Sequence, residues 1–76
     1  MSVIVTAEGQ IKKGDKLKIT GKNLERDSYD EITVDDVITG SNGNEEVIIN
    51  KDENYYFITK VLIDGKSWAE QVEIIS

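Results

Sequence analysis

The sequence predicts an all-β domain, because apolar residues alternate with polar ones, and glycine- and asparagine-rich turn signals separate the apolar segments. A helical period is much rarer along the chain. With 76 residues there is room for one domain, which we expect to span residues 1–76. No internal repeat, linker or low-complexity tract divides it.

The first two strands are expected at residues 3–6 and 16–20. The second alternates strictly, which places Leu17 and Ile19 on the core face and the lysines between them in water. The glycine turn at residues 13–15 precedes this strand.

A third strand is expected around Ile32 and Val34, which share one face. If the same phase continued to Ile38, Asp36 would point into the core. We therefore expect a bulge or bend at Asp35 and Asp36 that shifts the register by one residue.

The strongest turn signal is the Asn-Gly pair within residues 40–44, which joins residues 37–38 to residues 47–49 as a hairpin. A second turn at residues 51–54 leads into residues 55–63, the longest expected strand. Both faces of that strand are largely apolar, so a central position is expected.

The end of the chain allows two interpretations. After a turn at residues 64–65, residues 67–70 have capping-box spacing, so a helical turn could precede a last strand at 72–75. Alternatively, residues 66–75 form one bent strand. The expected core consists of Leu17, Ile19, Ile32, Val34, Phe57, Val61, Val72 and Ile74.

Short antiparallel strands leave open edges, and closing the sheet removes them. We therefore expect a small five- or six-stranded antiparallel barrel, Src-homology-3-like or oligonucleotide-binding-like. The segment 14–24, Gly-Asp-Lys-Leu-Lys-Ile-Thr-Gly-Lys-Asn-Leu, resembles the second strand of immunoglobulin-like sandwich domains of bacterial proteins and transcription factors. That resemblance implies a short immunoglobulin-like β-sandwich as the alternative, and it implies no function.

Composition excludes much chemistry. The chain has no histidine and no cysteine, so nucleophilic triads, histidine acid-base catalysis and the common zinc and iron-sulfur ligand sets are excluded. Neighbouring carboxylates at 35–36 and 52–53 would point to opposite faces of a strand and would not converge on a substrate. Residues 42–46 lack the spacing of a calcium loop. We expect no enzyme activity, no cofactor and no metal.

The lack of cysteine also favours a reducing compartment, since small secreted domains usually depend on disulfides. The first residues have no basic start and no apolar run long enough for a signal peptide or a membrane span. We expect the cytoplasm of a cell, or of an infected host cell, and no membrane association.

Charge is segregated along the chain. Residues 12–22 carry a local charge of +4, and residues 25–53 carry −8 within a net charge of −6. The acidic segment is either a solvated surface or a face that meets a basic partner. Direct nucleic-acid binding is disfavoured, because it needs a larger basic footprint.

Aromatic side chains supply candidate anchors for a partner. Tyr55 and Tyr56 cannot both point inward on an extended strand, and Trp68 follows a glycine turn. Exposed aromatics beside acids are typical of protein-binding patches. The candidate partner-binding residues are Tyr29, Asp30, Glu31, Asp35, Asp36, Glu45, Glu46, Tyr56 and Trp68.

These observations favour a small, acidic, non-enzymatic module that binds another protein with a basic surface. Such a module could be a virus- or mobile-element-encoded modulator or inhibitor of a host protein. One alternative is an acidic nucleic-acid mimic that occupies a DNA- or RNA-binding protein. Another is a structural or decoration subunit that joins a larger assembly through an added strand.

Overall fold

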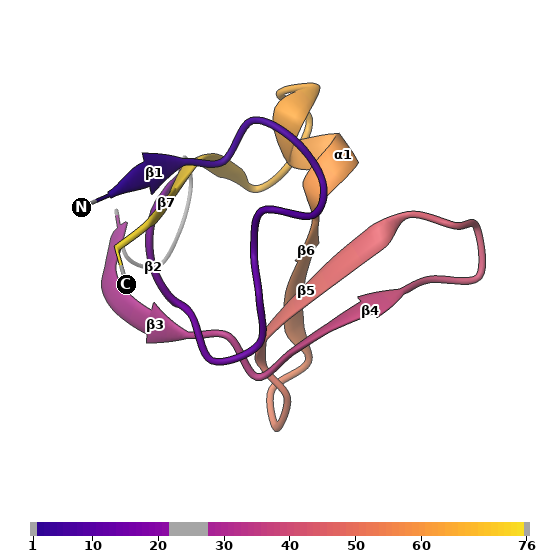
Figure 1. Ribbon diagram of the computed structural model, residues 1–76, viewed down its shortest axis with the longest axis horizontal. Helices are drawn as coiled ribbons and strands as arrows, with labels where there is room; N and C mark the ends of the chain where they lie inside the picture. Colours follow the sequence, from indigo (N-terminus) through magenta and orange to yellow (C-terminus); the bar gives the residue numbers. More distant parts are fainter. Residues whose placement is uncertain (1, 22–27, 76) are drawn as a thin grey trace.

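In the computed structural model, which describes residues 2–21 and 28–75, the strands form two antiparallel sheets (Figure 1). The first sheet has the order β1-β7-β2-β3, with β1 at Val3–Ile4, β7 at Ala69–Ile74, β2 at Lys16–Gly21 and β3 at Ser28–Thr33. The second has the order β4-β5-β6, with β4 at Asp36–Thr39, β5 at Glu45–Asn50 and β6 at Tyr55–Ile58. A short helix, α1 at Thr59–Ile63, lies between β6 and β7 in the chain. The expected all-β character is confirmed.

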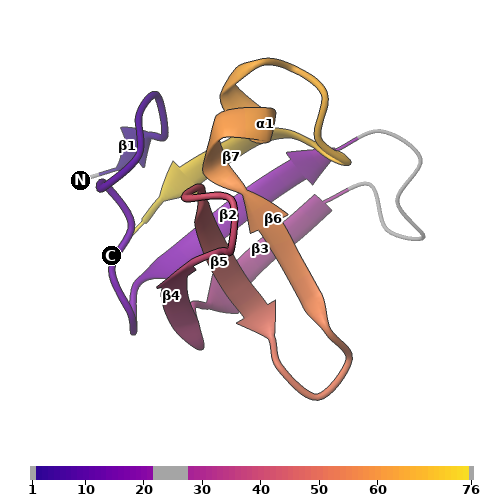
Figure 2. The same cartoon turned by 90° about the vertical axis from the view of Figure 1, so that its right-hand side faces the viewer.

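Strand β2 is one of the two inner strands of the first sheet, beside β7. Its alternating pattern buries Leu17 and Ile19 completely and leaves the residues between them exposed, as the period-two pattern predicts. Leu17 lies opposite Ile32 on β3 and Ile74 on β7. Figure 2 shows β2 and β3 side by side, with β5 and β6 crossing them.

The chain passes from the first sheet to the second at Val34 and Asp35. The amide of Val34 donates to the carbonyl of Asp15 at 2.8 Å, and the amide of Asp35 donates to the carbonyl of Ile48 at 2.8 Å. The expected break at Asp35 and Asp36 is therefore confirmed. Beyond it the phase changes, since Val37 is half-buried and Ile38 is 43% exposed.

Both turns of the second sheet lie where they were predicted. In the first, the amide of Gly40 donates to the carbonyl of Asn44 at 2.8 Å, and Gly43 has a φ of 84°. A positive φ of this size is a conformation that glycine adopts readily. In the second turn Asn54 has a φ of 58°. The β4–β5 hairpin extends away from the first sheet (Figure 1).

The prediction of one strand over residues 55–63 is wrong beyond Ile58, where α1 begins. The core explains the change. In α1, Thr59 and Leu62 lie three residues apart on one side of the helix, and both are buried, while Ile63 is 45% exposed. An extended strand in phase with the buried Phe57 would have pointed Ile63 inward and Leu62 outward. Burial of Leu62 therefore requires the helical turn.

Of the two interpretations of the chain's end, the helical turn at residues 67–70 is wrong, since β7 begins at Ala69. The amide of Ala69 donates to Oγ of Ser67 at 3.2 Å, so the serine hydroxyl bonds the first residue of a strand rather than of a helix. The bent-strand interpretation of residues 66–75 holds from Ala69 to Ile74.

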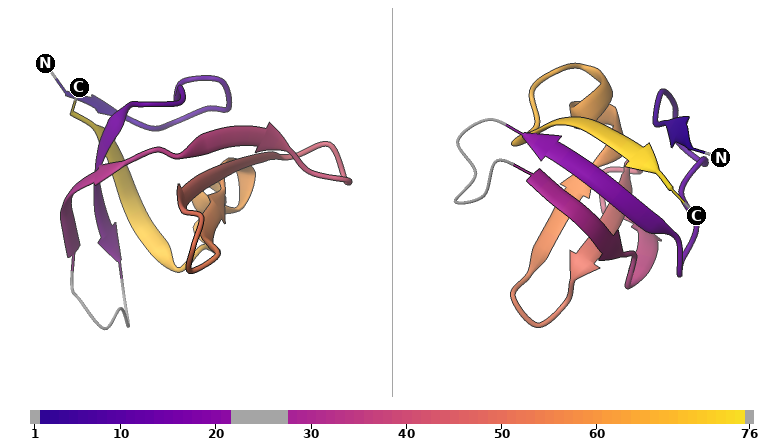
Figure 3. Two further views of the ribbon diagram at one scale, coloured as in Figure 1. Left: turned by 90° about the horizontal axis from the view of Figure 1, so that it is seen from below. Right: turned by 90° about the vertical axis from the view of Figure 1, so that its left-hand side faces the viewer.

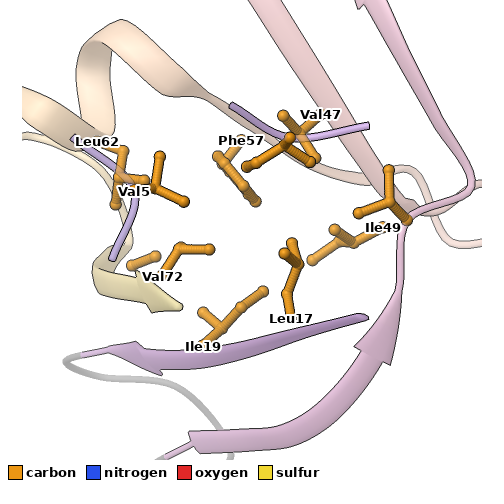
Figure 4. Packing of buried hydrophobic residues seen from close by; sticks show 11 residues of the cluster. Val5, Leu17, Ile19, Val47, Ile49, Phe57, Leu62 and Val72 are labelled. Carbon is orange, nitrogen blue, oxygen red and sulfur yellow. The ribbon is translucent and has the colours of Figure 1, made fainter. Parts of the chain in front are cut away.

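The core lies between the two sheets, which face each other (Figure 3), and both sheets contribute side chains to it (Figure 4). The buried apolar residues are Val5, Ile11, Leu17, Ile19, Val34, Val47, Ile49, Phe57, Leu62, Ala69 and Val72. Five of the expected core residues are confirmed there, namely Leu17, Ile19, Val34, Phe57 and Val72. Ile32 and Ile74 are partly buried against the cluster, whereas Val61 is half-buried and is not part of it.

Candidate functional site

One face of the β4-β5-β6 sheet points away from the core and forms an open hollow, which we call the outer face. Asp36 lies opposite Ile48, which lies opposite Tyr56, and Ile38 lies opposite Glu46. Because opposite residues point to the same side of a sheet, these five side chains share the outer face. They surround a hollow of about 450 Å³, whose remaining lining residues are Lys51, Asn54 and Tyr55.

The apolar part of the outer face is open to solvent. Ile38 is 43% exposed, and Tyr55 and Tyr56 are each 45% exposed. The expectation that the two tyrosines do not both point inward is confirmed. Both line the hollow because the β5–β6 register shifts at this point, with Ile48 opposite Tyr56 but Asn50 opposite Tyr55. Such an extra residue in one strand interrupts strict alternation.

Two carboxylates, those of Asp36 and Glu46, lie within the outer face. Oδ1 of Asp36 accepts the amide of Val37 at 2.9 Å. Glu46 lies so close to Gly40 that a Cβ added to Gly40 would overlap Glu46 Oε2. Across residues 2–21 and 28–75, neither carboxylate has a cation within ion-pair distance.

Two other predicted partner-binding residues instead hold the chain together. Oδ2 of Asp35 accepts the amide of Lys51 at 2.9 Å, which fixes the start of the β5–β6 turn. Glu45 accepts the amide of Gly9 at 3.1 Å through Oε1 and the hydroxyl of Thr59 at 2.6 Å through Oε2. Their carboxylates are therefore less available to a partner than those of Asp36 and Glu46.

The remaining acids of the prediction belong to β3, in the first sheet. Glu31 pairs with Lys16 at 2.7 Å between Oε1 and Nζ, and both side chains are about half exposed. The hydrogen bond and the charge of Glu31 raise the pKa of the Lys16 ammonium above its ordinary value. Tyr29 and Asp30 also belong to β3, and their side chains lie outside the described part of the structure.

Trp68 connects the two sheets. Its indole Nε1 donates to the carbonyl of Tyr56 on β6 at 3.1 Å, just before β7 begins at Ala69. Its ring meets that of Phe57 edge to face, with centroids 6.4 Å apart and planes at 76°. Trp68 is 36% exposed. It thereby links β6 to the start of β7, which belong to different sheets.

The structure thus brings together three of the predicted residues, Asp36, Glu46 and Tyr56, and places Glu31 on the other sheet. Sequence reasoning missed the other residues that line the outer face, which are Ile38, Ile48, Lys51, Asn54 and Tyr55. A signal was present. Once the hairpin turn is placed, the residues that alternate with the buried Val47 and Phe57 must share the opposite face.

Elsewhere, a smaller hollow of about 260 Å³ lies where β1, α1 and β7 meet, with Ile4 and Ile63 as its exposed apolar residues. Within the described ranges, no group of three or more acidic side chains is placed to hold a metal ion. In the same ranges, no helix has the length and apolar character needed to cross a membrane.

Comparison with known proteins gives no relative. No protein-family model matches the chain, and no curated protein or solved structure matches it significantly. A functional assignment therefore depends on the geometry of the outer face.

Proposed function

We propose that this chain is a small, non-enzymatic module that binds another protein through the outer face of the β4-β5-β6 sheet. One observation carries the proposal: a hollow of about 450 Å³ in which exposed Tyr55, Tyr56 and Ile38 lie among carboxylates. Aromatic residues are enriched at protein interfaces, and the buried centre of an interface is more apolar than its rim.

The charges of the outer face support a partner with a basic surface. Asp36 and Glu46 add negative charge to the hollow, and Lys51 is the basic residue that lines it. Asp52 and Glu53 follow Lys51 in the adjoining turn. An acidic rim of this kind attracts a basic partner and raises its association rate.

We also propose a finer description of the fold, an open Src-homology-3-like barrel. The strands after β1 follow one path, from β2 through β3 and β4 to β5 and β6, and β7 then returns beside β2. The direct passage from β3 into β4 joins the two sheets on one side. On the other side the side chain of Trp68 connects β6 to the start of β7.

The biological role that we propose follows the sequence argument: modulation or inhibition of a host protein by a virus- or mobile-element-encoded chain. We place that role in the cytoplasm, because a cysteine-free domain of this size suits a reducing compartment.

The test is capture of partners from the native host by the parent chain, followed by binding measurements on variants. We expect Tyr56→Ala to speed dissociation and to weaken binding by about 1 to 3 kcal/mol. Combined Asp36→Asn and Glu46→Gln should slow association and flatten its dependence on salt.

Ile63→Ala is the matched control, because Ile63 is also 45% exposed but lies on α1 beside the smaller hollow. If Tyr56→Ala binds like the parent, or if Ile63→Ala weakens binding equally, the outer face is not the interface. Capture of a nucleic-acid-binding protein whose nucleic acid competes with the chain would instead favour the mimic.

A further inference from the structure

The side chains of the outer face form a pattern in which apolar and acidic positions alternate. Asp36 and Ile38 point outward from β4, Glu46 and Ile48 from β5, and Tyr56 from β6. Across the strands the order is acid, isoleucine, tyrosine in one row and isoleucine, acid, isoleucine in the next, where Ile58 lies opposite Glu46. Each carboxylate is therefore next to apolar surface on its own strand and on the neighbouring one.

Such a pattern fits a ligand side chain that has both an apolar stem and a positive head. A purely apolar side chain would remove carboxylates from water without a partner, which costs free energy. A small, strongly hydrated cation would leave the exposed Ile38 and Tyr56 uncovered. Lysine and arginine side chains have both parts, because their methylene stems lie on apolar surface while the charged end stays at its edge.

Arginine fits better than lysine for two reasons. Its planar guanidinium can donate two parallel hydrogen bonds to one carboxylate, and it stacks on an aromatic ring. The outer face offers carboxylates at Asp36 and Glu46, and exposed tyrosine rings at residues 55 and 56.

The position of Glu46 strengthens this choice. Its carboxylate lies against Gly40, where the absence of a Cβ leaves it room. Among the described residues it has no ion-pair partner, so an incoming guanidinium would not have to displace one. Lys51 lies beyond the end of β5, on the side of the turn at 51–54, whereas Glu46 is near the other end of the strand.

We infer that the outer face binds an arginine side chain of the partner protein, with its stem over Ile38 and Ile48, its guanidinium on Glu46 and Tyr56 beside it. The inference rests on the proposed function and specifies the chemistry that the same face recognises.

The test uses acetylated and amidated Ser-Leu-Arg-Leu-Ser, together with counterparts that have lysine or citrulline at the centre. Citrulline keeps the planar shape and loses the charge. Each peptide is titrated into the ¹⁵N-labelled full chain, and amide chemical shifts are followed. We expect shifts in residues 36–38, 46–48 and 55–56, with arginine binding about three- to tenfold more tightly than lysine and citrulline weakest.

Two variants separate the charge of Glu46 from its position. Glu46→Gln removes the charge, and Gly40→Ala keeps it but displaces the carboxylate. The backbone of Gly40 does not have a positive φ, so alanine is compatible with the turn. Both variants should bring the arginine peptide down to the affinity of the lysine peptide. Glu73→Gln, an equal charge change on β7 of the other sheet, is the control and should leave the preference unchanged.

The outcomes distinguish this inference from the proposed function. Equal binding of the three peptides on the outer face, or an arginine preference that survives both variants, would overturn the arginine assignment and leave the binding face in place. Chemical-shift changes confined to another surface, or no changes with any peptide, would also overturn the arginine assignment. In that case the binding measurements with Tyr56→Ala on a captured partner would show independently whether the outer face is the interface.

Discussion

Glu45 joins parts of the chain that are far apart in sequence. Its carboxylate accepts hydrogen bonds from the amide of Gly9 and the hydroxyl of Thr59, while its own amide donates to Oε2 of Glu8 at 2.9 Å. The loop before β2, the start of β5 and the start of α1 therefore meet at this one residue. Thr59 is completely buried, so its hydroxyl depends on Glu45 for a partner.

Replacement of Thr59 by valine should show what this contact contributes. Thr59→Val keeps the shape of the side chain but removes the donor to Glu45, so we expect a loss of about 1 to 3 kcal/mol in the free energy of unfolding. Urea denaturation measures it. Thr20→Val on β2 is the control, because Thr20 is exposed, and its effect should stay within about 0.5 kcal/mol. Equal effects of the two variants would mean that the hydrogen bond from Thr59 to Glu45 does not contribute to the free energy of unfolding.

At the scale of elements, the transition from β6 to α1 shows where sequence reasoning is weakest. Residues 55–63 are aromatic or β-branched at most positions, so their intrinsic preference is extended. Tertiary packing overrides that preference, because α1 turns Leu62 into the core. The turns and the strict alternation of β2 were predictable because they depend on neighbouring residues alone.

The end of α1 supplies a prediction about backbone conformation. Gly65 follows the last turn with a φ of 74°, and its amide donates to the carbonyl of Leu62 at 3.0 Å. A Cβ added there would meet no atom within 4 Å outside the two neighbouring residues, so the cost of alanine is conformational. We expect Gly65→Ala to destabilise the fold by about 1 to 2 kcal/mol, measured by denaturation.

Gly65→Asn is the comparison, since asparagine tolerates a positive φ better than alanine. Gly65→Asn should therefore lower the free energy of unfolding less than Gly65→Ala does. The opposite order, or no cost for alanine, would show that the chain relaxes away from this conformation without loss.

For the whole molecule, the sequence predicted the all-β character and part of the core, but not the arrangement of the strands in two sheets. Alternation identifies which residues of one strand share a face, yet it does not state which strands are neighbours. Pairing of β7 with β2 joins segments about fifty residues apart. Val5 belongs to the expected strand at 3–6 but lies past the end of β1, and Ile11 lies in the loop before β2, so neither burial follows from an alternating pattern. The outer face was predictable only in part. Alternation with Val47 and Phe57 identifies its residues on β5 and β6, but which strands bring them together depends on the registers of β4, β5 and β6.

Replacement of Phe57 should affect the stability of the whole domain. Phe57 is 2% exposed, and it contacts Trp68, so Phe57→Ala should cost about 3 to 5 kcal/mol. That is a large fraction of the 5 to 15 kcal/mol typical of a domain, and thermal denaturation should show a markedly lower midpoint. Phe57→Leu, which fills more of the space, should cost less.

The parent chain should fold without a metal ion. We expect a far-ultraviolet spectrum dominated by β structure that is unchanged by excess EDTA, because histidine and cysteine are missing from the chain. A helical spectrum, or unfolding on addition of chelator, would contradict this prediction.

Trp68 is the single tryptophan of the chain, so all indole fluorescence originates where its side chain bonds β6. Its emission therefore reports on the surroundings of this one side chain. Separation of the indole from the Tyr56 carbonyl and from the Phe57 ring would expose the indole further to water. A partner that inserted a strand beside β6 would have to displace the indole from that carbonyl and would shift the emission to longer wavelength. A partner that covered only the outer face would leave the indole in place, so the presence or absence of this shift identifies how the chain is bound.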